Sequence, residues 1–103
     1  MNIGNSIKRL RKQKGMNQSE FGNKCGLSQT ALSQIETGFA RPNKKTLEKI
    51  CNILEVPEVL LYLLSMDEED VPDEKKQQYK LTYPLIKELA INLFYEDKNK
   101  VIV

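Results

Sequence analysis

The sequence predicts an all-α fold. Its apolar residues recur at intervals of three or four through most of the chain, which is the spacing of an amphipathic helix. Only five of the 103 residues are glycine and four are proline, and long alternating runs of β-branched residues are absent. Apolar residues make up 40% of the chain and charged residues 29%, as in soluble globular domains. A chain of this length can form one compact core with an appended segment.

The first helix is expected over residues 5–14. Ile3, Ile7 and Leu10 fall on one face, while basic side chains crowd the remaining surface. Gly15 suits the left-handed backbone conformation that commonly ends a helix. The chain therefore opens with a basic, amphipathic helix.

The second helix is expected over residues 18–25. Asn17 and Glu20 have the spacing of a capping box, in which each side chain accepts a hydrogen bond from the backbone of the other residue. Gly26 ends this helix.

The third helix begins after Ser28, which is a good N-cap, and Gly38 ends it. The residues expected on its outer face are Gln29, Thr30, Ser33, Gln34 and Thr37. The second and third helices meet at a tight, glycine-containing turn over residues 24–28. Two short helices joined in this way form a helix-turn-helix.

A fourth helix is expected over residues 44–54, with Asn43 as its cap. Pro57 is well placed at the first position of a fifth helix, because proline fits the first turn. This fifth helix is apolar nearly all round, so we expect it to bury more than one face. Beyond it, the chain should become helical again from about Pro72, and Pro84 should break or kink that helix.

Charge divides the chain into two halves. Residues 1–50 hold ten Lys and Arg against three Asp and Glu, a net charge of +7. Residues 51–103 hold six Lys against eleven Asp and Glu, a net charge of −5, so the whole chain carries +2. This asymmetry indicates that only the first half meets a polyanion. The densest acidic run, over residues 67–74, is either a solvated linker or a segment that keeps the tail off that polyanion.

Several functional classes are disfavoured. The chain has no histidine, the commonest general acid–base and metal-binding side chain. Cys25 and Cys51 have no paired spacing, so we expect free thiols in the core of an intracellular protein. The N-terminus lacks the apolar segment of a signal peptide, and the apolar run over residues 59–64 is too short to span a bilayer. We therefore expect a cytoplasmic protein with no catalytic centre, metal, cofactor or membrane association.

Over residues 7–57 the sequence resembles the Cro/repressor-type, or XRE-type, helix-turn-helix transcription regulator family. The matching segments, in the family's order, are IKRLRKQKG, NQSEFGNKCGLSQTALSQIETG, RP and TLEKICNILEVP. The resemblance implies a five-helix repressor-like DNA-binding bundle, followed here by a C-terminal helical extension. In such a bundle the third helix enters the major groove and the second lies across the DNA backbone.

The resemblance also implies DNA contacts at individual residues. Glutamine suits adenine because its amide can pair with N6 and N7 at once, and a helix N-terminus favours a phosphate. The residues expected to reach base edges are Ser28, Gln29, Thr30, Ser33 and Gln34. The residues expected to contact phosphates are Asn17, Gln18, Arg41, Asn43, Lys44 and Lys45.

Arg11 and Glu36 match an ion pair that family members place between the first and third helices. Because Glu36 follows the inward-facing Ile35, we expect a partly buried pair that fixes the third helix. Two positions depart from the family pattern. Gly22 replaces alanine, which weakens the second helix by about 1 kcal/mol unless close packing compensates. Phe39 replaces a polar or basic residue, and we expect it to pack locally, with a DNA wedge or a contact to a second subunit as alternatives.

We divide the chain into a DNA-binding domain over residues 1–65, an acidic linker over residues 66–74 and a helical extension over residues 75–103. Family members usually pair, so that two groove-binding helices read half-sites about 34 Å apart. An apolar stripe in the extension is expected to form the dimer interface, and the alternative is that it folds back on its own domain. The stripe consists of Leu85, Ile86, Leu89 and Leu93.

The leading hypothesis is therefore a sequence-specific regulator that binds double-stranded DNA, namely a repressor that occupies a palindromic operator as a homodimer. The alternative is an antitoxin or another interaction protein whose C-terminal tail binds a partner protein. An enzyme is not expected, because helix caps and a solvated surface account for the polar residues.

Overall fold

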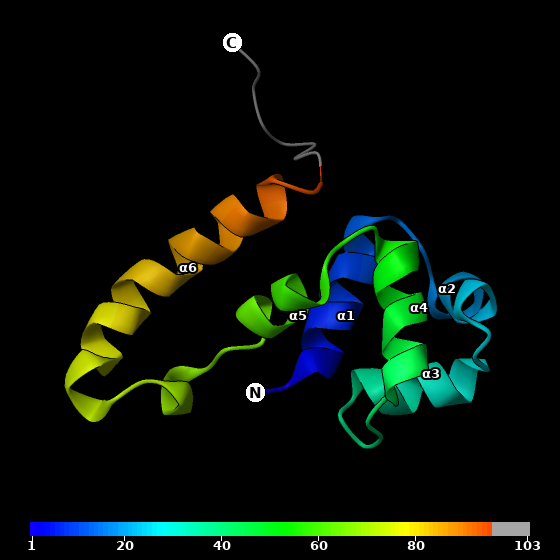
Figure 1. Ribbon diagram of the computed structural model, residues 1–103, viewed down its shortest axis with the longest axis horizontal. Helices are drawn as coiled ribbons and strands as arrows, with labels where there is room; N and C mark the ends of the chain where they lie inside the picture. Colours follow the sequence, from blue (N-terminus) through cyan, green and yellow to red (C-terminus); the bar gives the residue numbers. More distant parts are fainter. Residues whose placement is uncertain (96–103) are drawn as a thin grey trace, which may run out of the picture.

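The computed structural model describes residues 1–95, and all of their regular structure is helical (Figure 1). The predicted all-α fold is therefore confirmed. In chain order the elements are α1 (Ile3–Gln13), α2 (Gln18–Cys25), α3 (Gln29–Glu36), α4 (Lys44–Leu54), α5 (Glu58–Leu64), the 3-10 turns η1 (Glu68–Asp70) and η2 (Asp73–Lys75), and α6 (Lys76–Asn92). The end of the predicted extension, residues 96–103, lies outside the described residues.

Side chains just before the helices determine where these helices begin. Asn17 Oδ1 accepts the N–H of Glu20 at 2.8 Å, and the Glu20 carboxylate accepts the N–H of Asn17 in return, which is the predicted capping box. Ser28 and Asn43 cap α3 and α4 in the same way, through the N–H three residues further on. Pro57 occupies the cap position before α5 and not the predicted first helical position.

The core lies between α1, α2, α3, α4 and α5. Helix α1 packs against α3, α4 and α5, and α2 packs against α3 and α4. The largest fully buried side chains are Ile7, Leu10, Phe21, Cys25, Leu32, Ile50, Leu54 and Leu61. Cys25 and Cys51 are free and buried, and burial raises the pKa of the Cys51 thiol to about 11. Both thiols belong to the apolar core, as expected from the sequence.

Helix α5 buries one face only. Leu60, Leu61 and Leu64 point into the core, whereas the side chains of Val59 and Tyr62 are 69% and 41% exposed. The prediction that α5 buries more than one face is therefore wrong for the described chain. Its neighbours α1, α4 and α6 leave one side of the short helix uncovered.

The acidic run folds into the two turns η1 and η2, which carry ion pairs to other parts of the chain. The N-terminal ammonium group lies 3.1 Å from Asp67, and Lys80 on α6 lies 3.3 Å from Glu68. Lys76 donates hydrogen bonds to the carbonyl oxygens of Glu68 and Val71. These contacts hold the start of α6 against the acidic turns.

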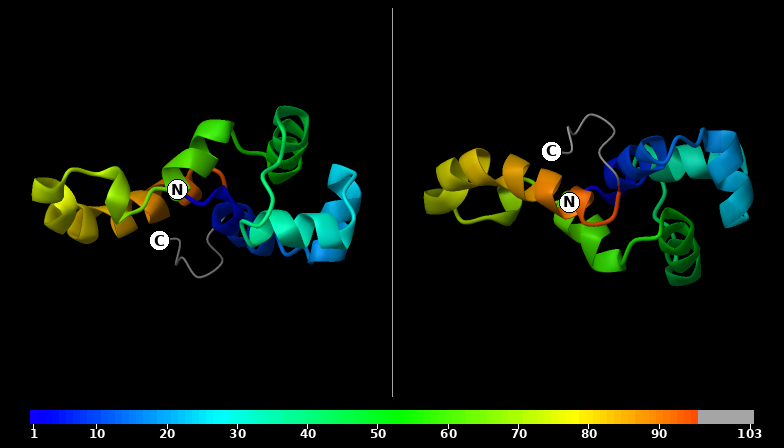
Figure 2. Two further views of the ribbon diagram at one scale, coloured as in Figure 1. Left: turned by 90° about the horizontal axis from the view of Figure 1, so that it is seen from below. Right: turned by 90° about the horizontal axis from the view of Figure 1, so that it is seen from above.

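Helix α6 is continuous through Pro84, so of the two predicted effects of this proline, a break or a kink, the break is wrong. Proline lacks the N–H that would bond to the carbonyl oxygen four residues earlier, on Lys80. Both residues are exposed, and water can therefore satisfy that oxygen. The helix lies at the end of the molecule opposite α2 (Figure 2).

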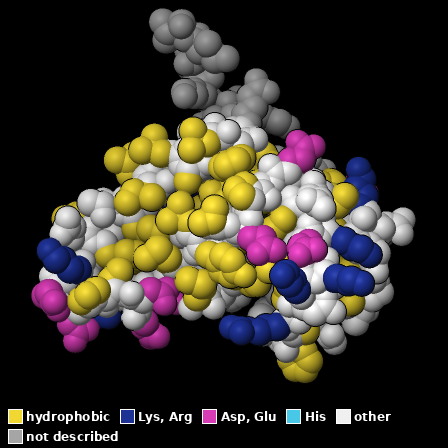
Figure 3. Space-filling model, in the orientation of Figure 1, with side chains coloured by type: hydrophobic (Ala, Val, Ile, Leu, Met, Phe, Trp, Pro, Cys, Tyr) yellow, Lys and Arg dark blue, Asp and Glu magenta, His cyan; other side chains and the backbone are white. Residues whose placement is uncertain are grey.

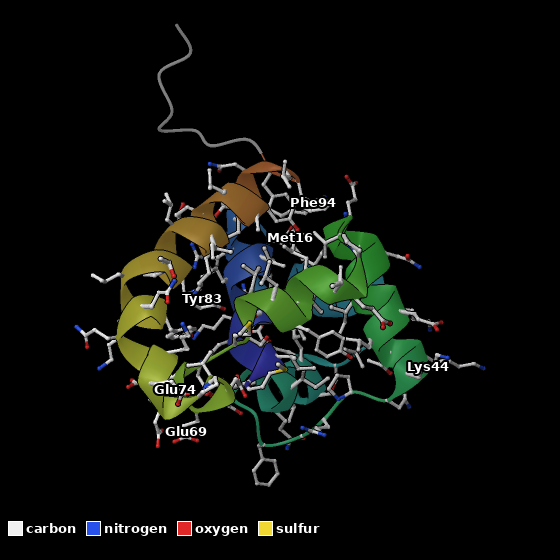
Figure 4. The ribbon with its side chains drawn as sticks, turned by 60° about the vertical axis from the view of Figure 1, so that its left-hand side comes forward. Met16, Lys44, Glu69, Glu74, Tyr83 and Phe94 are labelled. Atoms are coloured by element: carbon white, nitrogen blue, oxygen red, sulfur yellow. The ribbon has the colours of Figure 1, made fainter. Side chains whose placement is uncertain are left out.

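Three tyrosine hydroxyls dock α6 and the turn after it onto the domain. Tyr79 and Tyr83 donate to the carbonyl oxygens of Met66 and Leu63, near the end of α5, and Tyr95 donates to the carbonyl oxygen of Leu54, at the end of α4. Figure 4 shows Tyr83 on the side of α6 that faces α5. Leu54 is the last residue of α4, so the Tyr95 hydroxyl satisfies a carbonyl group that the helix end leaves without an intrahelical partner.

The docked face of α6 is not the predicted stripe. Tyr83, Ala90 and Ile91 are buried against the domain, and Glu88 pairs with Arg9 of α1 at 2.7 Å. The four stripe residues lie on the opposite side and are 45–79% exposed. The helix thus packs on its own domain while its apolar stripe faces solvent.

A close helix contact that the sequence analysis missed lies at the start of α1. Asn2 Oδ1 accepts the N–H of Gly4 at 3.0 Å, so α1 begins at Ile3, two residues earlier than predicted. A Cβ atom on Gly4 would lie only 2.2 Å from the carbonyl oxygen of Ile35 and 2.8 Å from that of Glu36. The absence of a side chain therefore lets α1 approach the backbone at the end of α3.

We predict that Gly4→Ala lowers the free energy of unfolding by about 1–3 kcal/mol, because the methyl group must push α1 and α3 apart. Urea denaturation measures the effect. Asn5→Ala, at an exposed position of the same helix, is the control and should change stability by less than about 0.5 kcal/mol. An unchanged denaturation midpoint in Gly4→Ala would contradict the close contact.

Candidate nucleic-acid interface

The outer face of α3 is polar and forms part of a shallow hollow. The side chains that line this hollow are Gln18, Gln29, Thr30, Ser33 and Gln34. Four of these residues are predicted base contacts, and Gln18 is a predicted phosphate contact from the first position of α2. The fold therefore brings together residues from both helices of the helix-turn-helix on one surface.

Ser28 lies at the edge of this surface and caps α3. Its Oγ accepts the N–H of Ala31 at 3.0 Å, and the residue is exposed. The hydroxyl proton is a second hydrogen-bonding group on the same atom, so capping leaves Ser28 able to donate to a base or a phosphate.

A buried ion pair lies next to the polar face, at the end of α3. Arg11 Nε donates to Glu36 Oε2 at 2.7 Å and Arg11 Nη2 donates to Glu36 Oε1 at 3.0 Å. The two side chains are only 6% and 1% exposed. The structure thus places the ion pair expected from the sequence between α1 and the last residue of α3, in the two-bond geometry that suits arginine and a carboxylate.

Two further hydrogen bonds extend the pair to α2. Arg11 Nη1 donates to the carbonyl oxygen of Met16 at 2.8 Å, just before α2, and Gln18 Nε2 donates to Glu36 Oε1 at 3.0 Å. Sequence reasoning treated Gln18 only as a phosphate contact. The structure shows that its amide nitrogen also belongs to the network that joins α1, α2 and α3.

The other predicted phosphate contacts lie at the starts of α2 and α4. Asn17 and Asn43 use their Oδ1 atoms as helix caps, while the amide nitrogen of such a side chain can donate to a phosphate. Arg41, Lys44 and Lys45 are exposed near the start of α4, and Figure 4 shows Lys44 extending away from the molecule. The start of α4 therefore carries three exposed cations, and the start of α2 offers uncharged donors and a helix N-terminus.

The charge asymmetry of the sequence is visible on the surface. In Figure 3 most of the visible Lys and Arg side chains lie over the part of the molecule formed by α1 to α4, while Asp and Glu side chains lie around the acidic turns and also beside these cations. The basic part is the part that carries the polar face of α3. A polyanion is therefore attracted to that end of the molecule.

The two departures from the family pattern have different structural outcomes. A Cβ atom on Gly22 would lie 2.9 Å from the carbonyl oxygen of Leu27, whose own N–H donates to the Gly22 carbonyl oxygen at 2.7 Å. Gly22 thus permits the tight turn between α2 and α3. Phe39 is 82% exposed, so the prediction that it packs locally is wrong for the described chain.

Residues 1–95 contain neither a metal-binding cluster nor a membrane-spanning helix. No group of three or more Cys, Asp or Glu side chains in this part of the chain could hold a metal ion. None of its helices is long and apolar enough to cross a membrane.

Comparison with known proteins identifies similar chains. Residues 7–61 match the helix-turn-helix family profile. The chain is 38% identical over 72 residues to the ImmF control region 10 kDa protein of Bacillus phage phi105, a match that covers 70% of this chain and 77% of that protein. It is also 38% identical over 74 residues to YqaE of Bacillus subtilis, an uncharacterized HTH-type transcriptional regulator, covering 70% of this chain and 62% of that one.

A third similar protein is the HTH-type transcriptional regulator SinR of Bacillus subtilis. It is 40% identical over 55 residues, which is 52% of this chain and 50% of SinR. No solved structure matches the chain significantly.

We predict that Glu36→Gln lowers the free energy of unfolding by about 3–5 kcal/mol, because it leaves the buried Arg11 guanidinium without its counter-charge. Thermal and urea denaturation measure the loss. Glu48→Gln, at an exposed position of α4, is the matched control and should be nearly neutral. A double variant, Arg11→Met with Glu36→Met, should recover part of the loss, whereas equal stability of Glu36→Gln and the wild type would show that the pair is unimportant.

Proposed function

The chain belongs to the XRE-type helix-turn-helix family of DNA-binding transcription regulators, and from this premise we propose that it represses transcription by occupying a palindromic operator as a homodimer. Membership of this family also makes it a non-enzymatic protein. Its place of action is then the cytoplasm, where an operator is accessible.

The observation that carries the proposal is the polar face of α3. Gln29, Thr30, Ser33 and Gln34 line one shallow hollow with Gln18, and Gln18 joins this hollow to the buried Arg11–Glu36 pair. In a helix-turn-helix, the second helix of the motif enters the major groove and presents such side chains to base edges. Because the Arg11–Glu36 pair holds α3 on α1, discrimination between DNA sequences depends on the side chains of α3 and not on movement of the helix.

Each side chain on this face has a chemistry that suits a base edge. Gln29 and Gln34 can each donate to N7 and accept from N6 of an adenine in one bidentate contact. Thr30 offers a hydroxyl to any base or a methyl group to thymine, and Ser28 and Ser33 offer hydroxyls. Base contacts in this proposal therefore come from α3 and its N-cap residue.

The flanking residues supply affinity and register. Asn17 and Gln18 at the start of α2 contact the sugar–phosphate backbone on one side of the groove, where the helix N-terminus also attracts a phosphate. The sugar–phosphate backbone on the other side of the groove is contacted by residues at the start of α4, namely Arg41, Asn43, Lys44 and Lys45. Phosphate contacts of this kind release counterions, so affinity depends steeply on salt but not on sequence.

The dimer in this proposal forms through the outer face of α6. Figure 3 shows apolar side chains spread over the surface of α5 and α6. The stripe residues Leu85, Ile86, Leu89 and Leu93 are large, apolar and exposed, and Leu81 extends the stripe by one turn. An apolar face of this extent on a small protein commonly marks an interaction site. Because tyrosine hydroxyls fix α6 to the domain, pairing of two α6 helices would also fix the distance between two α3 helices.

Selection of bound sequences from random DNA gives the operator and tests the proposal. We expect a palindrome whose half-sites lie about one helical turn apart. Enrichment of a single, asymmetric site would contradict the two-fold arrangement.

We predict that Gln29→Ala and Lys44→Ala weaken binding to that operator in different ways. Gln29→Ala should weaken operator binding by about 1–3 kcal/mol and relax specificity at one base pair. Lys44→Ala should weaken binding to all sequences alike and reduce the slope of log K against log salt by about one. Fluorescence anisotropy over a salt series measures both, and a base-selective effect of Lys44→Ala would count against its phosphate contact.

We predict that Leu85→Lys combined with Leu89→Lys converts a dimer into a monomer, because two charges cannot be buried in an apolar interface without partners. Sedimentation equilibrium gives the mass. Gln77→Lys adds a charge at an exposed position of α6 outside the stripe and should leave the dimer intact. A wild-type chain that sediments as a monomer would rule out the homodimer and favour the alternative, in which this stripe binds a partner protein.

A further inference from the structure

Phe39 is the most exposed large apolar side chain of the described residues, at 82%. It lies in the loop between α3 and α4, at a position where the family pattern has a polar or basic residue. Isolated apolar side chains on a surface are common and need no function. The position of Phe39 relative to the proposed DNA contacts is what distinguishes it.

The backbone around Phe39 is held in place. The N–H of Gly38 donates to the carbonyl oxygen of Ile35 at 3.1 Å, and the N–H of Ala40 donates to that of Gln34 at 3.0 Å. Gly38 has a φ of 84°, which is the left-handed conformation that turns the chain out of α3. The loop is therefore closed onto the end of α3, and Phe39 is presented from a fixed turn.

The Phe39 ring points away from the body of the domain. Gly38 and Ala40 on either side of it line a hollow of about 480 Å³ that also involves the N-terminal residues and α4. Phe39 does not line that hollow, although both its neighbours do. The ring is thus directed into solvent, with no packing partner of its own at this end of the molecule.

Phe39 lies between two sets of proposed DNA contacts. Gln34, five residues earlier, belongs to the polar face of α3, and Arg41, two residues later, belongs to the phosphate contacts near α4. When α3 occupies the groove, the loop that joins these contacts must pass from the base edges to the sugar–phosphate wall. Phe39 is the exposed apolar residue of this connecting loop.

We propose that Phe39 is a further DNA-binding residue, which lays its ring on an apolar surface of the operator, either the C5-methyl group of a thymine or the face of a deoxyribose. This inference rests on the proposed function. Both surfaces are apolar, and phenylalanine is among the side chains that contact thymine methyl groups in the major groove. Covering about 60 Å² of the ring at ~25 cal/mol per Å² corresponds to roughly a tenfold gain in affinity.

The test measures the affinity of the full chain for a duplex that carries one half-site of the selected operator. Phe39→Ala should weaken binding about 3- to 10-fold at every salt concentration without changing the slope of log K against log salt, because no phosphate contact is lost. Val59→Ala removes a similarly exposed apolar side chain on α5 and is the control, with no expected effect. Far-ultraviolet circular dichroism verifies that both variants fold.

Replacement of single thymines by deoxyuridine distinguishes the two apolar surfaces. If Phe39 contacts a methyl group, one replacement should weaken wild-type binding and have no further effect on Phe39→Ala. If the ring lies on a deoxyribose, Phe39→Ala should still bind more weakly while no single replacement mimics it. Both results support the proposal.

Two results would overturn it. The first is an unchanged half-site affinity of Phe39→Ala. The second is a loss confined to the full operator together with a shift in the monomer–dimer equilibrium, which would place the ring against a second copy of the chain. Gln29→Ala in the same assay separates this inference from the proposed function: if Gln29→Ala loses affinity and Phe39→Ala does not, only the inference on Phe39 fails.

Discussion

The buried contact between Arg11 and Glu36 is the interaction on which the rest of the structure depends. It joins the end of α3 to α1, and through the carbonyl oxygen of Met16 and the amide of Gln18 it also holds the start of α2. Burying two charges is unfavourable unless their hydrogen-bonding groups are satisfied, and here several bonds converge on the pair. In return, the position of α3 relative to α1 and α2 is fixed by directional bonds. The same helix carries the polar residues that line the shallow hollow, so Glu36 of the ion pair and the binding face belong to one helix.

The second constraint is the docking of α6. Tyrosine hydroxyls bind the carbonyl groups at the ends of α4 and α5, and ion pairs tie the acidic turns to α6 and to the N-terminus. As a result, the helix that bears the exposed apolar stripe is oriented by the same bundle that orients α3. An interface formed on that stripe would therefore set the distance and orientation between the two DNA-binding faces, because α6 is docked on the bundle that carries α3. Carboxylates of the second half pair with the basic first helix, as Glu88 does with Arg9, and the densest acidic run is confined to the turns η1 and η2.

The sequence was most informative where structure is determined locally. Asn17 and Ser28 marked the starts of α2 and α3 because a helix cap depends on neighbours within three residues. Contacts between distant segments left no such signal. Gly4 could have been an ordinary helix residue, and only the packed fold shows the backbone of α3 within contact distance of it. Pro84 was expected to break or kink α6, and the helix does not break there because the exposed position lets water replace the missing bond. The direction of Phe39 was also unpredictable, because it depends on how the turn after α3 closes onto the domain.

The central claim is that the exposed polar face of α3 enters the major groove. The most direct measurement is a nuclear magnetic resonance titration of the labelled chain with an operator duplex. The account predicts that the backbone amides of Gln29, Thr30 and Gln34 shift strongly and in proportion to added DNA, together with those at the starts of α2 and α4. If the resonances of these amides did not shift while resonances from α5 or α6 did, the DNA-binding surface would lie elsewhere and the central claim would be wrong.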